Sequence, residues 1–287
     1  MQLEVQLFPE TPVRLPFSYY DKLGAALYSA IEQGDKPFSA DLHDGDSHKN
    51  RIKMFCFSPL NSCEMEIHGG AKGSHGRAEA ENHFLLFKGQ TQFRIGSPWP
   101  ELMNWLGEGL LKTGFLRIGS QVFRVCGAKL LAPPSFSEVM NWRPIKAGSI
   151  VTSWSLPDRN EKRFILPDTP ADGEPDCAML LRRNLCHKWK RLCEIRPDIA
   201  RSWSRASAES DVKAALSENQ LGIEWQHAEG TRPDYKTRLH QVGRTPVRSW
   251  RCDVRLSAPP YGQRLAWACG LGDMNSRGFG LVEGEPV

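Results

Sequence analysis

The stretch HFLLFKGQTQFRI, residues 83–95, predicts a long β-strand or a β-hairpin, because its apolar residues come in short runs rich in phenylalanine and leucine. Helices are expected on both sides of it, over Tyr19–Ile31 and Trp99–Leu111, where apolar residues recur at helical spacing. Three further strands are expected in this half, at Leu3–Phe8, Ile52–Phe57 and Phe115–Val125. The order is therefore strand, helix, strands, helix, strand.

This βαββαβ order is that of a ferredoxin-like (RRM-like) domain, and the second half of the chain repeats it less clearly. Pro133, Pro134 and Ser135 mark a linker. The elements expected beyond it are strands at Ser149–Trp154 and within Val242–Leu256, helices at Cys177–Leu192 and Tyr261–Ala268, and a closing strand after a glycine-rich loop. The expected fold class is α+β, with two tandem ferredoxin-like domains over residues 1–130 and 136–287.

The composition, 40% hydrophobic and 24% charged over 287 residues, is typical of soluble globular proteins. No stretch approaches the roughly 20 apolar residues of a membrane span, and the N-terminus lacks the layout of a signal peptide, so a cytoplasmic protein is expected. The eight cysteines form no CxxC pair, and Cys186-His187-Cys193 is the nearest approach to a zinc motif. We therefore expect reduced, buried thiols, no metal site and no cofactor.

Positive charge is concentrated toward the C-terminus. The segment Thr231–Arg264 holds eight basic residues against two acidic ones, whereas Met1–Lys129 is close to neutral. A one-sided segment of this kind suits a polyanionic partner such as nucleic acid.

The sequence GLGDMNSRGFGLVE, residues 270–283, follows the expected short helix and leads into the closing strand. Helix, loop, strand is the reverse of the dinucleotide-binding order, and no Walker signature is present. Glycines let backbone amides approach an anion closely, and the polar centre of the loop adds side-chain donors. The residues expected to bind RNA here are Gly270, Gly272, Asn275, Ser276, Arg277, Gly278 and Gly280.

This loop resembles the C-terminal glycine-rich loop of the CRISPR-associated repeat-processing endoribonucleases, the sixth Cas family within the RAMP superfamily. Leu42-His43-Asp44 followed by KMFCFSPL, residues 53–60, resembles the family's "LHD … KxFxFSxL" stretch. Residues 181–189 resemble its "LxxNLxxKY" helix, with Trp189 where tyrosine is usual. The resemblance spans nearly the whole chain, although residues 197–240 match nothing in it.

The resemblance implies an endoribonuclease that cuts CRISPR repeat RNA (pre-crRNA) without metal or cofactor, leaving 2′,3′-cyclic phosphate and 5′-hydroxyl ends. Some members of the family stay bound to the product hairpin within an effector complex, so other complex subunits are further partners that the resemblance implies. Two alternatives stay open: a non-catalytic subunit that holds crRNA, and a protein that binds a small anionic metabolite.

Metal-free cleavage of RNA needs a group to move protons and a cation to offset charge on the phosphorane. By the resemblance, His43, Lys53 and Tyr28 supply this set, with His48 as the rival histidine and Arg51 or Lys49 as rival cations. Tyr28 also falls among the apolar positions of its helix, so a core role is the alternative. Trp250 and Phe279 are candidates for base stacking or for the core. The remaining cations expected to contact RNA phosphates are Arg182, Arg183, Lys188, Lys190, Arg244, Arg248 and Arg251.

Overall fold

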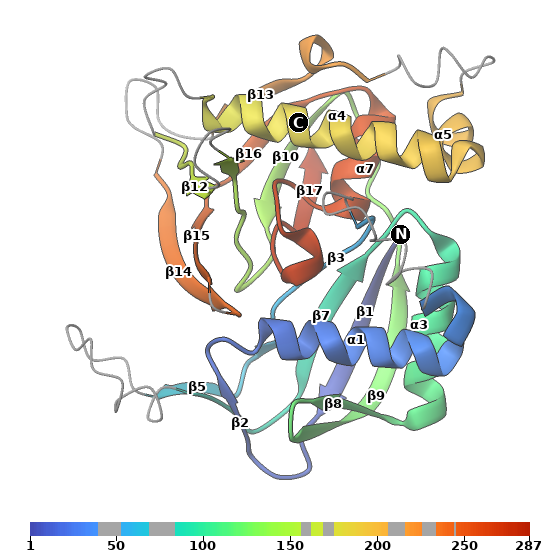
Figure 1. The fold of residues 1–287 in the computed structure, drawn as a ribbon, viewed down its shortest axis with the longest axis vertical. Helices are drawn as coiled ribbons and strands as arrows, with labels where there is room; N and C mark the ends of the chain where they lie inside the picture. The colour runs from blue at the N-terminus through green and yellow to red at the C-terminus, as the bar shows by residue number, and fades with distance from the viewer. Residues whose placement is uncertain are drawn as a thin grey trace.

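The computed structural model describes residues 1–39, 53–68, 84–155, 162–168, 175–205, 216–225, 234–243 and 245–287. They form two α+β units, each with a sheet that carries two helices on one face (Figure 1). Each unit has its own cluster of buried apolar side chains. The two clusters meet where Trp99, from the first unit, packs against both.

The first unit has the strand order β3-β7-β1-β9-β8, with all neighbours antiparallel. Apart from the added edge strand β8, this is the order of a ferredoxin-like domain, in which the last strand lies beside the first. The elements are β1 (Gln2–Phe8), α1 (Tyr20–Gly34), β3 (Cys56–Phe57), β7 (Thr91–Gly96), α3 (Pro100–Thr113), β8 (Phe115–Ile118) and β9 (Gln121–Leu131). Both predicted helices are thus confirmed to within three residues at each end.

The prediction of one long strand or a hairpin over residues 83–95 is wrong. β6 (Phe84–Phe87) pairs with β2 (Val13–Pro16) and β5 (Met65–His68) in a separate small sheet, whereas β7 pairs with β1, β3 and the short β4 (Asn61–Ser62). Alternating apolar residues indicate which face of a strand is buried, but they do not specify its partner. The predicted strand at Phe115–Val125 is in turn a hairpin, because the chain reverses at Gly119-Ser120 between β8 and β9.

The second unit repeats the same order, β13-β16-β10-β17. Its elements are β10 (Val139–Pro144), α4 (Cys177–Ile195), β13 (Gly222–Trp225), β16 (Val254–Ser257), α7 (Pro260–Cys269) and β17 (Val282–Pro286). Two hairpins are inserted, β11–β12 (Ser153–Ser155 and Lys162–Phe164) and β14–β15 (Lys236–Val242 and Thr245–Arg251). Short helices complete it at α5 (Pro197–Ser204), η2 (Glu218–Gln220) and η3 (Asn275–Arg277).

The first strand of this unit is β10, not the predicted Ser149–Trp154. Met140 and Trp142 on β10 are fully buried, while Ser149–Trp154 contributes only a bridge from Ile150 to Trp250 and the start of β11. The predicted helix at Cys177 is confirmed and begins at an N-cap, where the Asp176 side chain accepts from the Met179 amide over 2.6 Å.

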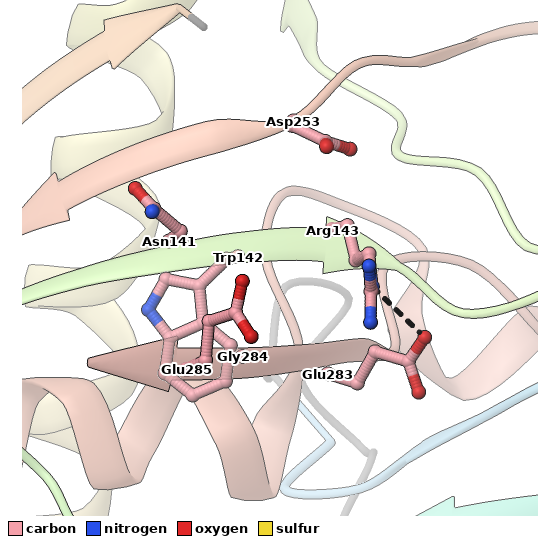
Figure 2. A pocket seen from close by; sticks show the side chains of 7 residues that line it. All are labelled: Asn141, Trp142, Arg143, Asp253, Glu283, Gly284 and Glu285. Carbon is pink, nitrogen blue, oxygen red and sulfur yellow. Dashed lines mark hydrogen bonds and ion pairs between the residues drawn. The ribbon is translucent and has the colours of Figure 1, made fainter. Parts of the chain in front are cut away.

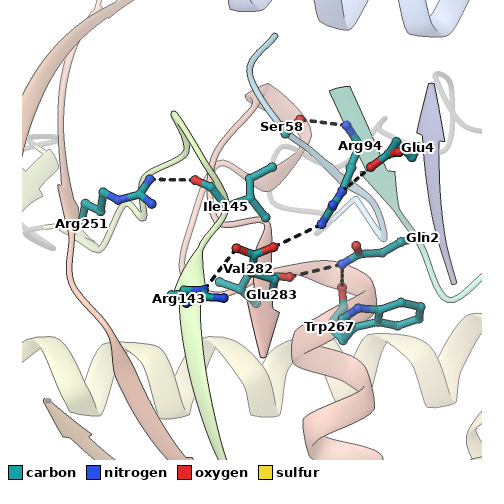
Figure 3. Close-up of polar contacts among 10 residues, drawn as sticks. All are labelled: Gln2, Glu4, Ser58, Arg94, Arg143, Ile145, Arg251, Trp267, Val282 and Glu283. Carbon is teal, nitrogen blue, oxygen red and sulfur yellow. Dashed lines mark hydrogen bonds and ion pairs between the residues drawn. The ribbon is translucent and has the colours of Figure 1, made fainter. Parts of the chain in front are cut away.

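Side chains at the junction fix the two units against each other (Figure 3). Gln2, at the start of β1, is 1% exposed, and its amide nitrogen donates to the carbonyl oxygens of Trp267 at 2.8 Å and Val282 at 3.3 Å. The Cys56 thiol, on β3, donates to the Ala268 carbonyl oxygen over 3.5 Å. Within the described ranges, no helix is long and apolar enough to cross a membrane.

Candidate functional site

Tyr28 and Lys53 are the two candidate catalytic side chains that the structure describes, and they are in direct contact. Lys53 Nζ donates to the Tyr28 hydroxyl oxygen over 2.7 Å, and the same ammonium lies 4.9 Å from the centre of the Tyr28 ring. Both residues are half-buried, and the Tyr28 ring meets the buried Phe55 edge-on at 5.7 Å. The other catalytic candidates lie outside the described residues: His43, His48, Lys49 and Arg51.

The glycine loop, residues 270–283, is closely packed and needs its glycines for that reason. Gly272 and Gly280 have φ angles of 70° and 77°, a region that favours glycine. A Cβ on Gly280 would lie 2.1 Å from the Leu271 carbonyl oxygen, and one on Gly272 would lie 2.3 Å from that of Val151. Gly270 and Gly278 are buried as well.

Asn275 holds this loop in shape rather than presenting its amide to solvent. Its side chain is buried, and Nδ2 donates to the carbonyl oxygens of Leu271 and Phe279, both at 3.1 Å. This corrects the expectation that the Asn275 side chain binds a phosphate, because its donors are used inside the loop.

Lys188 supports the same loop from α4. It is 0% exposed, and its Nζ donates to the carbonyl oxygens of Gly270 at 2.7 Å and Gly272 at 3.1 Å. Burial is the main cause that lowers the pKa of Lys188 to about 8. The expectation that Lys188 contacts RNA is therefore corrected, since a buried ammonium facing two carbonyls does not reach a ligand at the surface.

Asp273 ties the loop to α4 and β11, and sequence reasoning missed it. One carboxylate oxygen accepts from the Ser153 amide at 3.0 Å and from the Ser153 hydroxyl, and the other accepts from Asn184 Nδ2 at 3.0 Å. The sequence feature that could have indicated this role is the aspartate itself, an acidic residue at the centre of a loop that is otherwise expected to bind anions. Its negative charge is used to anchor the loop.

The tip of the loop keeps donors open to solvent and lies against α1. Ser276 is half-buried, and Arg277 is exposed with its Nη1 3.6 Å from Asp21 Oδ1 on α1. A Cβ on Gly24, also on α1, would lie 3.9 Å from the Ser276 carbonyl oxygen. Gly24 and Tyr28 are four residues apart and thus share a face of α1, so the loop tip lies one helical turn from Tyr28.

Of the cations expected on α4, Arg183 and Lys190 are exposed and Arg182 is half-buried. The Arg183 guanidinium lies 5.5 Å from the centre of the Trp154 ring, a cation–π contact. Arg183 also lines a hollow of about 230 Å³ between β11, α4 and the glycine loop, together with His187. Arg183 is thus the cation of α4 that lies at the hollow beside the loop, which Asp273 also lines.

The β14–β15 hairpin carries the remaining expected cations. Arg248 is exposed, whereas Arg251 is half-buried and donates from Nη1 to the carbonyl oxygens of Ile145 at 2.7 Å and Gly148 at 3.0 Å. Arg251 therefore holds a backbone turn, and Arg248 remains available to a ligand. Arg244 lies outside the described residues.

The two candidate stacking aromatics, Trp250 and Phe279, belong to the core. Trp250 is 0% exposed and Phe279 is 1% exposed. Phe279 stacks on Tyr20 of α1 at 5.5 Å and meets His240 of β14 edge-on at 5.0 Å. Burial lowers the pKa of His240 to about 4, so the imidazole is neutral at pH 7 and packs as an aromatic ring.

The open faces of both sheets carry carboxylates at the junction. Arg94 donates to Glu4 at 3.0 Å and to Glu283 at 3.3 Å, and Arg143 donates to Glu283 at 3.2 Å (Figure 3). A cavity of about 190 Å³ opens beside this chain of ion pairs, lined by Asn141, Trp142, Arg143, Asp253, Glu283, Gly284 and Glu285 (Figure 2). Three carboxylates against one guanidinium disfavour a phosphate there. Among the described residues, no group of three His, Cys, Asp or Glu side chains is arranged to hold a metal ion.

Two family models match the chain and together cover most of it. Residues 14–129 match the model described as CRISPR-associated protein Cas6, N-terminal, and residues 142–284 match the one described as CRISPR associated protein Cas6, C-terminal. The curated CRISPR-associated endoribonuclease Cas6 1 of Methanocaldococcus jannaschii is 27% identical over 146 residues, which is 50% of this chain. The match spans 51% of that relative's own length.

Solved structures share the fold over the whole chain. A structure described as CRISPR associated protein Cas6 is 19% identical with a TM-score of 0.66, covering 100% of this chain and 99% of that one. A Cas6-related protein from Pyrococcus furiosus is 17% identical with a TM-score of 0.70, covering 99% and 98%. A structure described as a RAMP protein binding different RNA substrates is 16% identical with a TM-score of 0.68, covering 99% of both.

Proposed function

Because the chain belongs to the Cas6 family of CRISPR-associated proteins, we propose that it is an endoribonuclease that cleaves CRISPR repeat RNA without a metal ion. The 2′-hydroxyl of the RNA attacks the adjacent phosphorus and expels the 5′-oxygen of the next nucleotide. The products carry a 2′,3′-cyclic phosphate and a 5′-hydroxyl, and cleavage at the repeats gives crRNA.

Three side chains take the roles that this reaction needs. Lys53 offsets the negative charge that develops on the phosphorane, and the Tyr28 hydroxyl, polarised by the ammonium that donates to it at 2.7 Å, donates to a phosphate oxygen. His43 moves the protons, because imidazole titrates near neutral pH. His48 is the rival for that role, and Arg51 is the rival cation.

The observation that carries this proposal is the shared face of α1. Asp21, Gly24 and Tyr28 follow one another at helical spacing, with Arg277 beside Asp21, the Ser276 carbonyl against Gly24, and Lys53 on Tyr28. Four residues of helix rise about 6 Å, which is of the order of one nucleotide step. An RNA strand whose phosphate is bound at the loop tip would therefore place its next phosphate close to the Tyr28–Lys53 pair.

The test incubates the protein with its cognate repeat RNA in EDTA and resolves the products on a gel, with the 3′ ends assayed for a cyclic phosphate. His43→Ala, Lys53→Ala and Tyr28→Phe are compared with the parent. Loss of one acid–base or electrostatic group is expected to lower the cleavage rate by about 10²–10⁴-fold. Binding of uncleaved RNA, measured separately, is expected to stay within about threefold, as these groups act on the reacting phosphate.

Two outcomes would change the assignment. Full activity of His43→Ala with loss in His48→Ala would move the proton-transfer role to His48. Tight binding by the parent without any cleavage would refute the enzyme and favour a subunit that holds crRNA.

A further inference from the structure

The open face of the first sheet carries an aromatic–arginine–aromatic row across three strands. In the strand register, Arg124 of β9 lies opposite Phe8 of β1 on one side and opposite Phe115 of β8 on the other. Residues paired in this way point to the same face of a sheet, with neighbouring strands about 4.8 Å apart. The row therefore places one phenyl ring on each side of the Arg124 guanidinium.

All three side chains of this row are open to solvent. Phe8 is 37% exposed, Phe115 is 44% exposed, and Arg124 is exposed with its guanidinium 6.0 Å from the centre of the Phe8 ring. The next pair along the same face, Arg117 and Val122, is exposed too. Core-forming residues of these strands point the other way, toward α1 and α3.

The segment that carries Phe115 and Arg124 has charge of one sign. From Phe115 to Ser137 the sequence has three cations, Arg117, Arg124 and Lys129, and no aspartate or glutamate. In the part of the chain that the structure describes, Arg124 and Arg117 form no ion pair. The surface thus combines exposed rings with positive charge that lacks a carboxylate partner.

We propose that this row, Phe8–Arg124–Phe115, binds unpaired nucleotides of RNA by stacking bases on the two phenyl rings. The guanidinium of Arg124 stacks with a base or meets a phosphate between them, and Arg117 extends the phosphate path. Bases within a duplex already stack on one another and are hidden, so the ligand is single-stranded. This deepens the proposed function, on which it rests, by assigning a site for a single-stranded part of the transcript away from the Tyr28–Lys53 pair.

The far side of the same open face limits the path of the strand. Toward the junction the face carries Glu4 beside Arg94 on the first sheet and Glu283 beside Arg143 on the second (Figure 3). In the cavity beside Arg143, three carboxylates from Asp253, Glu283 and Glu285 outnumber that one guanidinium, and this excess negative charge repels phosphates. The bound segment is therefore confined to the corner formed by β1, β9 and β8.

The test measures binding of an unstructured oligoribonucleotide of about ten nucleotides, within the site sizes usual for single-strand binding, by fluorescence anisotropy. Phe8→Ala and Phe115→Ala are each expected to weaken binding by about 5- to 140-fold, the range for losing one stacked base. Leu111→Ala is the matched control, because Leu111 is 70% exposed on α3, away from the row, and it should leave affinity within about twofold. A blunt RNA duplex is expected to bind the parent and both phenylalanine variants equally.

Conservative variants separate stacking from a loss of folding. Phe115→Trp keeps a ring at the site and should bind within about threefold of the parent. The proposal is overturned if both alanine variants bind the oligoribonucleotide as tightly as the parent does. It is also overturned if light scattering shows that the alanine variants differ from the parent in oligomeric state, because the row would then be a contact between copies of the chain through the edge strand β8. Cleavage of the repeat in EDTA is scored in parallel, so failure of the enzyme and failure of this surface are distinguishable.

Discussion

Replacing Gly280 by alanine tests whether the glycine loop is a packed structural element. At Gly280, φ is 77°, and an added Cβ would lie 2.1 Å from the Leu271 carbonyl oxygen and 2.2 Å from Asn275 Nδ2. Neither neighbour can move freely, because Leu271 N donates to the Gly280 carbonyl at 2.8 Å and Asn275 Nδ2 donates to the Leu271 carbonyl at 3.1 Å. The substitution therefore combines backbone strain with the loss of hydrogen bonds.

The magnitude follows from those contacts. Placing an L-residue with a Cβ in the left-handed region costs roughly 1–2 kcal/mol, and each of the two hydrogen bonds that must break or stretch contributes about 0.5–1.5 kcal/mol. Gly280→Ala should thus lower the free energy of unfolding by about 2–5 kcal/mol. Gly107→Ala is the matched control: Gly107 lies in α3 with nothing within 4 Å of its added Cβ, so a gain of about 0.4–1 kcal/mol is expected.

The assay is urea unfolding followed by tryptophan fluorescence and by circular dichroism. Seven of the nine tryptophans come at or after Trp142, so fluorescence reports mainly the second unit, and the dichroism follows both. Gly280→Ala should lower the urea midpoint of the fluorescence transition. Gly107→Ala, in the first unit, should raise the midpoint of the transition followed by circular dichroism. An unchanged fluorescence midpoint and slope in Gly280→Ala would refute the close packing of the loop.

Three other outcomes are expected. Lys188→Met should abolish a pH dependence of stability. Burial lowers the pKa of Lys188 to about 8, so between pH 8 and about 10.4 the unfolded chain binds one proton more than the folded chain. Over that range the free energy of unfolding of the parent, measured in urea melts, should rise by up to about 1.4 kcal/mol per pH unit relative to the variant. Arg277→Gln should weaken RNA binding and reduce the slope of log affinity against log salt by about one, as expected for a phosphate contact; an unchanged slope would argue against it. Asp176→Ala should lower the thermal midpoint through a loss of about 0.5–2 kcal/mol, since its side chain caps α4 at 2.6 Å from the Met179 amide.

The helices were predictable because their buried residues recur at helical spacing. The same helical spacing also predicts that Lys188 is buried. It lies seven residues after Leu181 and four before Leu192, and all three are fully buried, so its helical position faces the core. Its charge predicts a surface position, but a lysine can be buried where backbone carbonyl oxygens accept hydrogen bonds from its ammonium.

Strand pairing was less predictable, for a physical reason. The sequence QLEVQLF at β1 or FLLF at β6 indicates a strand, but hydrogen bonds between strands join backbone groups that every residue carries. The partner is chosen by the packing of both faces over the whole sheet. The strand β10 was missed because its run is short and ends at Pro144, close to the more apolar Ile150–Val151 that follows it.

The sequence predicts which residues belong to the candidate site, but it does not predict which of them are in contact. Tyr28 and Lys53 are 25 residues apart, and they meet because β3, which follows Lys53, lies at the edge of the sheet on which α1 packs. Nothing local in the sequence encodes that contact. The row formed by Phe8 and Phe115 is not visible in the sequence for the same reason, since only the register through Arg124 brings the two rings together.

The proposed site draws on both units, and the junction between these units contains buried polar contacts. The loop that would hold the phosphates comes from the second unit and is fixed there by Lys188, while the Tyr28–Lys53 pair comes from the first. An apolar junction would tolerate sliding, whereas the Gln2 amide must meet two particular carbonyl oxygens or leave them unsatisfied at a cost of about 1–3 kcal/mol each. Such directional contacts favour one precise placement of the first unit, and with it α1, against the second. In-line attack on a phosphate requires that precision, because misplacing reacting groups by about 1 Å can cost 10²-fold in rate.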